Sequence, residues 1–135
     1  MTIITNLAGI NLLAVLVAGM VHTVIGLIWF MPKFFGNLWV ELTGKEMKPA
    51  RQWIPAGLIG HLVMAFVLAI IVNLANATNV VSGMVVGVLV CLGFMATLEI
   101  GELIWEKIPL KLFMIRVGNQ LVGLGIAGSI LAVWR

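Results

Sequence analysis

Five polar residues that could bind a cation or carry a proton lie in the last two apolar segments of the chain. Glu99 and Glu102 are near the end of one segment, and Arg116, Asn119 and Gln120 are in the next. An ionisable side chain in hydrocarbon is costly unless it faces a partner or a hydrated cavity. These residues are therefore predicted to form a substrate or ion-binding site, in which the glutamates bind a cation or proton and Arg116 modulates them. The alternative is a purely structural ion pair.

Helical periodicity predicts that the two sets of polar residues face each other. One stripe of the third apolar segment holds Leu92, Met95, Glu99, Glu102 and Glu106, and one stripe of the fourth holds Arg116, Asn119, Gln120 and Gly123. At a rise of about 1.5 Å per residue, Glu99 and Arg116 lie at a similar depth, so we expect them to pair. Glu106 is expected to lie at the membrane interface.

Two histidines in the first and second apolar segments, His22 and His61, fall in the same half of the membrane by the same counting. Two imidazoles with nearby carboxylates could bind zinc or another transition metal, and two histidines alone could hold a haem. The alternative is that each ring hydrogen-bonds across helices. Each histidine shares a face with small residues that predict tight helix contacts, Gly19 and Gly26 for one and Gly57 and Ala65 for the other.

Motifs of familiar enzymes are missing from the sequence. It has no Ser-His-Asp or Cys-His arrangement, phosphate loop or nucleotide fingerprint, and its sole cysteine, Cys91, lies in mid-segment. The sequence thus argues against hydrolase and ATP-driven chemistry, and no enzymatic activity is predicted. Acid–base catalysis by an acid and histidine cluster is conceivable, but no substrate is indicated.

Composition predicts the elements that must position these residues. The 135-residue chain is 62% hydrophobic and 10% charged, and its mean hydropathy is +1.18. Four apolar runs, at Ile10 to Met31, Ile54 to Leu74, Val80 to Leu103 and Leu110 to Trp134, are each long enough to cross a bilayer. Only helices can do so without closing a barrel. We expect an all-α, four-helix transmembrane bundle, with residues 1–135 as a single domain.

The loops predict the orientation of the bundle. Cations gather in the first and third loops, at Lys33, Lys45, Lys48, Arg51, Lys107 and Lys111, whereas the second loop is uncharged. The positive-inside rule then places both termini outside, and no nucleic-acid partner is expected despite the net charge of +3. Phe34, Phe35, Leu38, Trp39 and Leu42 recur at helical spacing, which predicts a short interfacial helix in the first cytoplasmic loop, ended by Gly44.

A short sequence similarity links the two halves of the chain. Leu27, Ile28 and Trp29 precede Pro32, Lys33 and Phe35, while Leu103, Ile104 and Trp105 precede Pro109, Lys111 and Phe113. The two helical hairpins could be a diverged duplication, with a pseudo-two-fold axis along the membrane normal, as in some transporters. Alternatively, Trp, Pro and Lys simply favour membrane boundaries.

Several stretches carry a resemblance to a known family. They are Asn11 to Ala18, Gly26 to Phe30 with Pro32, Phe35, Gly36 and Trp39, and Pro109 to Phe113 with Ile115. Together they resemble an uncharacterised family of short bacterial membrane proteins, domain of unknown function 1761. The resemblance implies a four-helix protein of the bacterial inner membrane and no particular activity or cofactor.

Two functions are compatible with these patterns. The first is a transporter or channel-like protein for a cation, proton or small solute, which we expect to form a homo-oligomer in the lipid bilayer. The second is a non-transporting membrane module that binds metal, haem or a partner protein through its histidines and glutamates. Gly83-x-x-x-Gly87 in the third segment predicts close helix packing, within the bundle or between copies.

Overall fold

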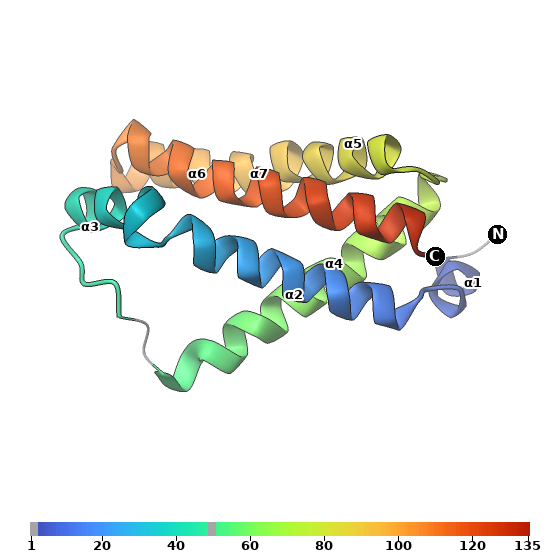
Figure 1. Cartoon of the computed structure of the whole chain (residues 1–135). Coiled ribbons are helices and arrows are strands. Elements are labelled where there is room, and N and C mark those ends of the chain that lie inside the picture. Colours follow the sequence, from blue (N-terminus) through green and yellow to red (C-terminus); the bar gives the residue numbers. More distant parts are fainter. Residues whose placement is uncertain (1–2, 49–50) are drawn as a thin grey trace.

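A computed structural model describes residues 3–48 and 51–135, and four helices in it are long and apolar enough to cross a membrane. They are α2 (Leu12–Trp29), α4 (Ile54–Leu74), the third span Val80–Glu106, and α7 (Leu110–Val133). In the third span, a π-helical segment, η3 (Cys91–Met95), joins α5 (Val80–Val90) to α6 (Ala96–Gly101), and a second one, η4 (Glu102–Glu106), follows α6. None of the described residues lies in a strand. The predicted all-α bundle of four spans is confirmed (Figure 1).

The helix starts follow from local sequence. Asn11 caps α2, because its side-chain oxygen accepts hydrogen bonds from the backbone amides of Leu13 and Ala14 at 3.0 and 3.1 Å. Asn79 and Ser82 form a reciprocal capping box at the start of α5. Pro109 precedes α7, where its missing N–H removes no helical hydrogen bond.

The turns arrange the spans up and down, so that the bundle has two unlike ends. α1 (Ile3–Ala8), the turn between α4 and α5, and the last turn of α7 lie at one end (Figure 1). The first loop and the turn at Lys107, whose φ is +53°, lie at the other. We call the second end the α3 end, after the short helix that it holds.

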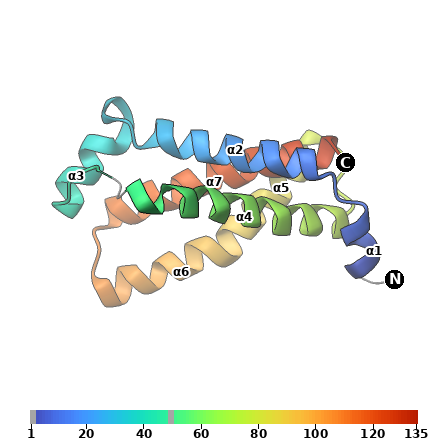
Figure 2. The ribbon, with the colours of Figure 1, turned by 90° about the horizontal axis from the view of Figure 1, so that it is seen from below.

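The closest helix packing joins α5 to α7 in the half away from the α3 end. A Cβ atom added to Gly83 would collide with the carbonyl of Gly128, and one added to Gly87 would collide with the carbonyl of Leu124. The hydroxyl of Ser129 donates to the carbonyl oxygen of Val80 at 3.0 Å. The close helix approach predicted from Gly83-x-x-x-Gly87 thus occurs inside the chain. Figure 2 shows α7 seated among α2, α4 and α5.

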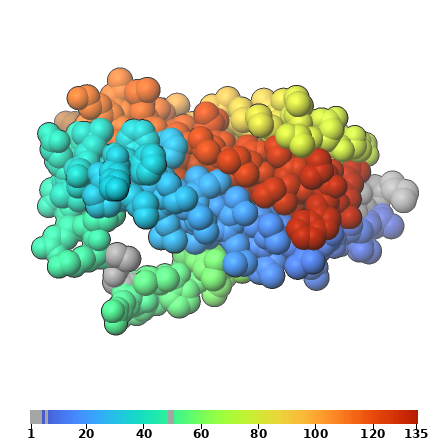
Figure 3. Space-filling model, in the orientation of Figure 1, coloured from blue at the N-terminus to red at the C-terminus, as the bar shows by residue number. Residues whose placement is uncertain are grey.

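The opposite half is more open because α4 leaves the bundle there. α2 and α4 cross at Gly19, where an added Cβ would lie 2.7 Å from the Leu62 side chain. Before this crossing, every residue from 51 to 60 is exposed, and no atom lies within 4 Å of a Cβ added to Gly57 or Gly60. The prediction of a tight helix contact at Gly57 is therefore wrong. In the space-filling view the start of α4 projects away from the other helices (Figure 3).

The first loop contains the expected short helix, but it starts later than the apolar pattern suggested. A kinked segment, η1 (Pro32–Gly36), precedes α3 (Asn37–Thr43), and Gly44 ends α3 with a left-handed φ of +65°. Phe34 has non-helical angles of −106° and −110°, which kink the chain before α3. Gly36 permits the kink, because a Cβ there would lie 2.8 Å from the backbone of Met31.

Candidate functional site

Arg116 of α7 lies between the two glutamates of the third span. Its Nη1 is 3.4 Å from Oε2 of Glu99 and 2.5 Å from Oε2 of Glu102. The side chains of Arg116 and Glu99 are 30% and 25% exposed, whereas Glu102 is 48% exposed. The contact predicted between Glu99 and Arg116 is present, and we call these three residues the charged triad. Glu102 is the most exposed of the three, so water or an ion can reach the triad most readily at Glu102.

The π-helical segments change the faces that the sequence pattern predicted for the third span. Leu92 was placed on the stripe of the glutamates but is 49% exposed, while Cys91 is buried and its Sγ lies 3.9 Å from the carbonyl oxygen of Val117. A π-helical turn adds a residue to the helical repeat, so the stripe does not continue through η3. Glu106 is exposed at the end of η4 and lies outside the triad.

His22 and His61 meet face to face where α2 and α4 cross. Their ring centroids are 4.6 Å apart and the ring planes differ by 17°. The hydroxyl of Thr23 donates to the carbonyl oxygen of Gly19 at 3.0 Å. The Thr23 hydroxyl oxygen also lies 2.9 Å from Nδ1 of His61. Because the hydroxyl has a single hydrogen, Nδ1 of His61 is the donor in the second bond, and Nε2 keeps the free lone pair.

His22 is pressed against α7 at Gly123. A Cβ atom at Gly123 would lie 2.5 Å from both Nε2 and Cδ2 of the imidazole, and His22 as a whole is only 2% exposed. Gly123 thus makes room for the ring. Asn119, one turn earlier on α7, faces Gly26, one turn later on α2, since a Cβ at Gly26 would be 3.9 Å from both polar atoms of the Asn119 side chain.

Three polar atoms at this helix contact have no hydrogen-bond partner among the described residues. They are Nε2 of His22, Oδ1 of Asn119 and Oε1 of Gln120, and each is shielded from solvent. Asn119 is 8% exposed, and the Gln120 side chain lies beside His22. Buried polar groups are nearly always satisfied by protein, water or a ligand. Because the imidazole and the Gln120 side chain interact, an N–H of His22 can satisfy Oε1 of Gln120, which leaves Oδ1 of Asn119 as the buried acceptor without a partner.

The histidines do not converge on a common ion. Face-to-face rings hold their nitrogen lone pairs side by side, whereas two imidazoles that share a metal or a haem iron direct nitrogens at one point. Within residues 3–48 and 51–135, no three His, Cys, Asp or Glu side chains gather closely enough to hold a metal ion. In this arrangement the donor set does not fit a transition metal or a haem.

Two residues near the site were not singled out from the sequence. Thr23 binds His61, and the Trp29 indole donates to the carbonyl oxygen of Ile115 at 3.1 Å while its ring lies against Gly118. Trp29 also packs on Phe35, with centroids 4.7 Å apart. Thr23 could have been found as a hydroxyl next to His22 at membrane depth. The indole bond could not, because Trp29 resembles any interfacial tryptophan.

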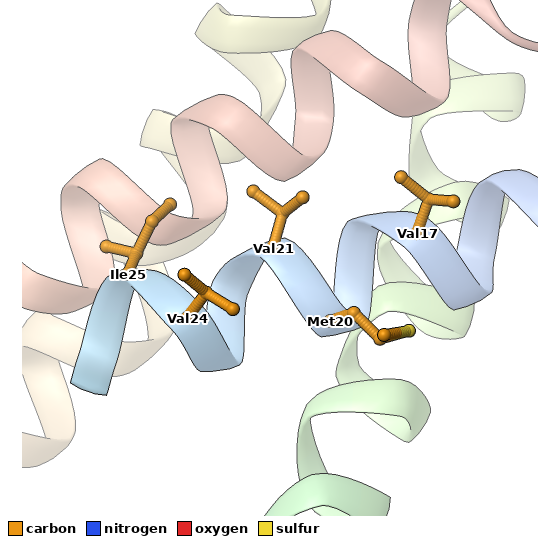
Figure 4. Close-up of a pocket in the computed structure, with 5 residues that line it drawn as sticks. All are labelled: Val17, Met20, Val21, Val24 and Ile25. Carbon is orange, nitrogen blue, oxygen red and sulfur yellow. The ribbon is translucent and has the colours of Figure 1, made fainter. Parts of the chain in front are cut away.

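The hollows on the outer surface have apolar linings and lie apart from the polar residues. One, along α2, is lined by Val17, Met20, Val21, Val24 and Ile25 (Figure 4). The other lies between α5 and α7 and is lined by Met84, Val88, Leu121, Val122, Gly125 and Ile126. Neither offers a polar group for recognition, and lipid chains suit both surfaces.

The structure thus brings the predicted site residues into one half of the bundle, as the charged triad, the histidine pair, and the amides Asn119 and Gln120 between them. No curated protein and no solved structure matches the chain. A family model matches residues 13–132, which include every residue of this polar site. The chain belongs to the family described as Protein of unknown function (DUF1761).

Proposed function

We propose that the protein is a transporter or channel-like protein of the bacterial inner membrane that moves a proton or another small cation. The observation that carries the proposal is the composition of the charged triad, in which one guanidinium faces two carboxylates. With both glutamates ionised, the triad has a net charge of −1. An unbalanced negative charge at membrane depth is costly, and a cation or a proton relieves it.

The three triad residues have different roles in this proposal. Glu102 is half-exposed and receives the cation from the α3 end, while Glu99 is the more deeply buried acceptor. Arg116 contacts both carboxylates, so it weakens cation binding enough for release. Channels and transporters need such moderate binding, because an ion that binds too tightly does not leave.

Orientation and assembly complete the proposal. The cation-rich loops lie at the α3 end, which we assign to the cytoplasm, with both termini outside. We propose a homo-oligomer, because four spans of this size enclose little space and the first half of α4 is exposed on all sides. The non-transporting module is less well supported, since the stacked histidines do not fit metal or haem.

Flux measurements in liposomes test the proposal. Purified protein is reconstituted, and the entry of protons, Na⁺, K⁺ and NH₄⁺ is followed with ion-sensitive dyes. We expect flux of at least one of these cations above that of empty liposomes, and a loss of about tenfold in Glu99→Gln and in Glu102→Gln, the cost of about 1.4 kcal/mol of binding.

Glu46→Gln is the matched control. Glu46 also forms an ion pair, with Lys48 at 3.3 Å, but both side chains are at least 80% exposed in the first loop. Its substitution should leave flux unchanged. The proposal is wrong if no cation moves, or if the triad variants conduct as well as Glu46→Gln.

A further inference from the structure

The stacked imidazoles of His22 and His61 are a pair of ionisable groups to which the proposed function gives no role. Their ring centroids are 4.6 Å apart, and the ring planes are within 17° of parallel. One ring can carry a proton in this arrangement, but two imidazolium charges so close together repel each other. At an effective dielectric constant of about 20, this repulsion weakens the binding of a second proton by about 400-fold. The geometry therefore limits the pair to one proton.

The two rings differ in their access to that proton. His22 is buried and packs on Gly123, whereas His61 is half-buried and directly follows residues 51–60, which are all exposed. Nδ1 of His61 donates to the Thr23 hydroxyl, so Nε2 of His61 is left with a lone pair that can accept a proton. Uptake of a proton from water at Nε2 converts the ring to imidazolium and leaves the bond to Thr23 in place. His61 is thus the ring that can be charged more readily.

The charges around the pair favour one bound proton over none or two. α2 and α4 contain no other ionisable side chain, and from α7 the neutral Gln120 side chain contacts the His22 ring. The nearest charged residue of α7 is Arg116, one helical turn before Gln120, and it belongs to the charged triad. The third span contributes the two glutamates of the triad and the buried Cys91, whose thiol is directed at the carbonyl oxygen of Val117. When ionised, the triad has a net charge of −1, which one proton on the histidine pair neutralises and a second would exceed.

We propose that His22 and His61 form a proton-binding site that holds a single proton, on Nε2 of His61. The site deepens the proposed function by naming the proton as the transported cation, and it rests on that function only in treating the proton as cargo. His22 supplies a neutral ring for the imidazolium to stack on, and the Thr23 hydroxyl accepts the other N–H of the imidazolium. Along α7 the pair lies deeper than the charged triad, so it extends the proposed path from the α3 end into the bundle.

Nitrogen NMR tests the site without relying on transport, because the chain has only two histidines. The full chain, with ¹⁵N in its imidazole rings, is placed in nanodiscs and titrated from about pH 8 to about pH 5, the range in which histidine changes charge. We expect one ring to become imidazolium and the other to stay neutral for at least about two further pH units, because the second proton binds several-hundredfold more weakly. The site is wrong if both rings take up protons as two separate histidines would, or if neither does.

Two variants with the same replacement assign the proton to one ring. His61→Phe and His22→Phe each remove one imidazole and keep an aromatic ring in the stack. We expect His22 to stay neutral over the whole range in His61→Phe, because it is buried, and His61 still to bind one proton in His22→Phe. If His22→Phe does not fold because its ring is too large beside Gly123, His22→Gln takes its place. The opposite pattern would place the proton on His22 and contradict the assignment.

Proton flux in liposomes separates the site from the proposed function. We expect His61→Phe to lower proton flux about tenfold, as in the triad variants. One proton bound by the pair without flux of any cation keeps the site and overturns the proposed function. Sodium or potassium flux with no proton uptake by the pair overturns the site and leaves the proposed function standing. Proton flux that is unchanged in His61→Phe would show that the bound proton is not the cargo, which overturns that part of the proposal.

Discussion

The two halves of the bundle use helix contact in opposite ways. Away from the α3 end, glycines bring the backbones of α5 and α7 together, and Ser129 shares its single hydroxyl hydrogen between the carbonyls of Val80 and Gly125. Towards the α3 end, α4 leaves the bundle, and the buried polar atoms without a hydrogen-bond partner lie where α2 still contacts α7. The comparison indicates that one half provides stability and the other a place for polar chemistry.

The largest expected loss of stability comes from disrupting the close contact between α5 and α7. In Gly87→Val, the new side chain would collide with the carbonyl of Leu124, which is backbone and cannot rotate away. We expect the free energy of unfolding in detergent to fall by about 3 kcal/mol, the upper part of the usual cost of overpacking. Unfolding in a mixed-micelle SDS titration measures it.

Gly93→Ala is the control for this variant. Gly93 is in the same span, and no atom lies within 4 Å of a Cβ added there. Its stability should stay within about 0.5 kcal/mol of the parent, or rise, because alanine favours helix. Equal losses in both variants would mean that α5 and α7 do not pack as closely as described.

The next effect concerns the charged triad. Arg116→Gln removes the positive charge and leaves two carboxylates near each other, so we expect a loss of about 1.5 to 3 kcal/mol, typical of hydrogen bonds to charged groups. The same SDS titration measures it, and a double mutant with Glu102→Gln should recover part of the loss.

Lys48→Gln breaks an ion pair that is exposed on both sides. Exposed pairs contribute little, so its stability should hardly change. If Arg116→Gln lowers the free energy of unfolding no more than Lys48→Gln does, the charged triad does not stabilise the fold.

These comparisons also show which features were predictable. The four spans follow from composition, because a backbone in lipid must satisfy its own hydrogen bonds. The contact of Glu99 with Arg116 follows from equal depth, since rise per residue is nearly constant in any helix. Depth along the membrane is thus easy to derive from sequence.

Rotation about the helix axis is harder to derive. The stripe that joined Leu92 to Glu99 was wrong because η3 adds a residue to the helical repeat, and no residue between Cys91 and Met95 signals it. The stacking of His22 on His61 depends on where α2 and α4 cross, which the close contact at Gly19 determines. Such contacts depend on the residues of both helices, so the sequence of one helix does not predict them.

A smaller effect is expected at Trp29, where α2 ends and the first loop begins. Trp29→Phe keeps the ring on Gly118 and Phe35 but removes the donor to the Ile115 carbonyl, so we expect a loss of about 1 kcal/mol. Trp105→Phe is the control, since Trp105 is 83% exposed. Equal effects would support equivalent roles for the two tryptophans, as the proposed duplication suggests, and would contradict the distinct role of Trp29.

The smallest effect tests whether the open half is organised or merely loose. Thr23→Val keeps the shape of the side chain but removes the partner of His61, and we expect a loss of about 0.6 kcal/mol, the average for such bonds between membrane helices. Thr97→Val should have less effect, because Thr97 bonds only to carbonyls of its own helix. Thr23→Ser should restore the parent value in the SDS titration, since serine keeps the hydroxyl. If Thr23→Val and Thr97→Val behave alike, His61 is not oriented by Thr23, and the histidine stack cannot hold His22 against α7.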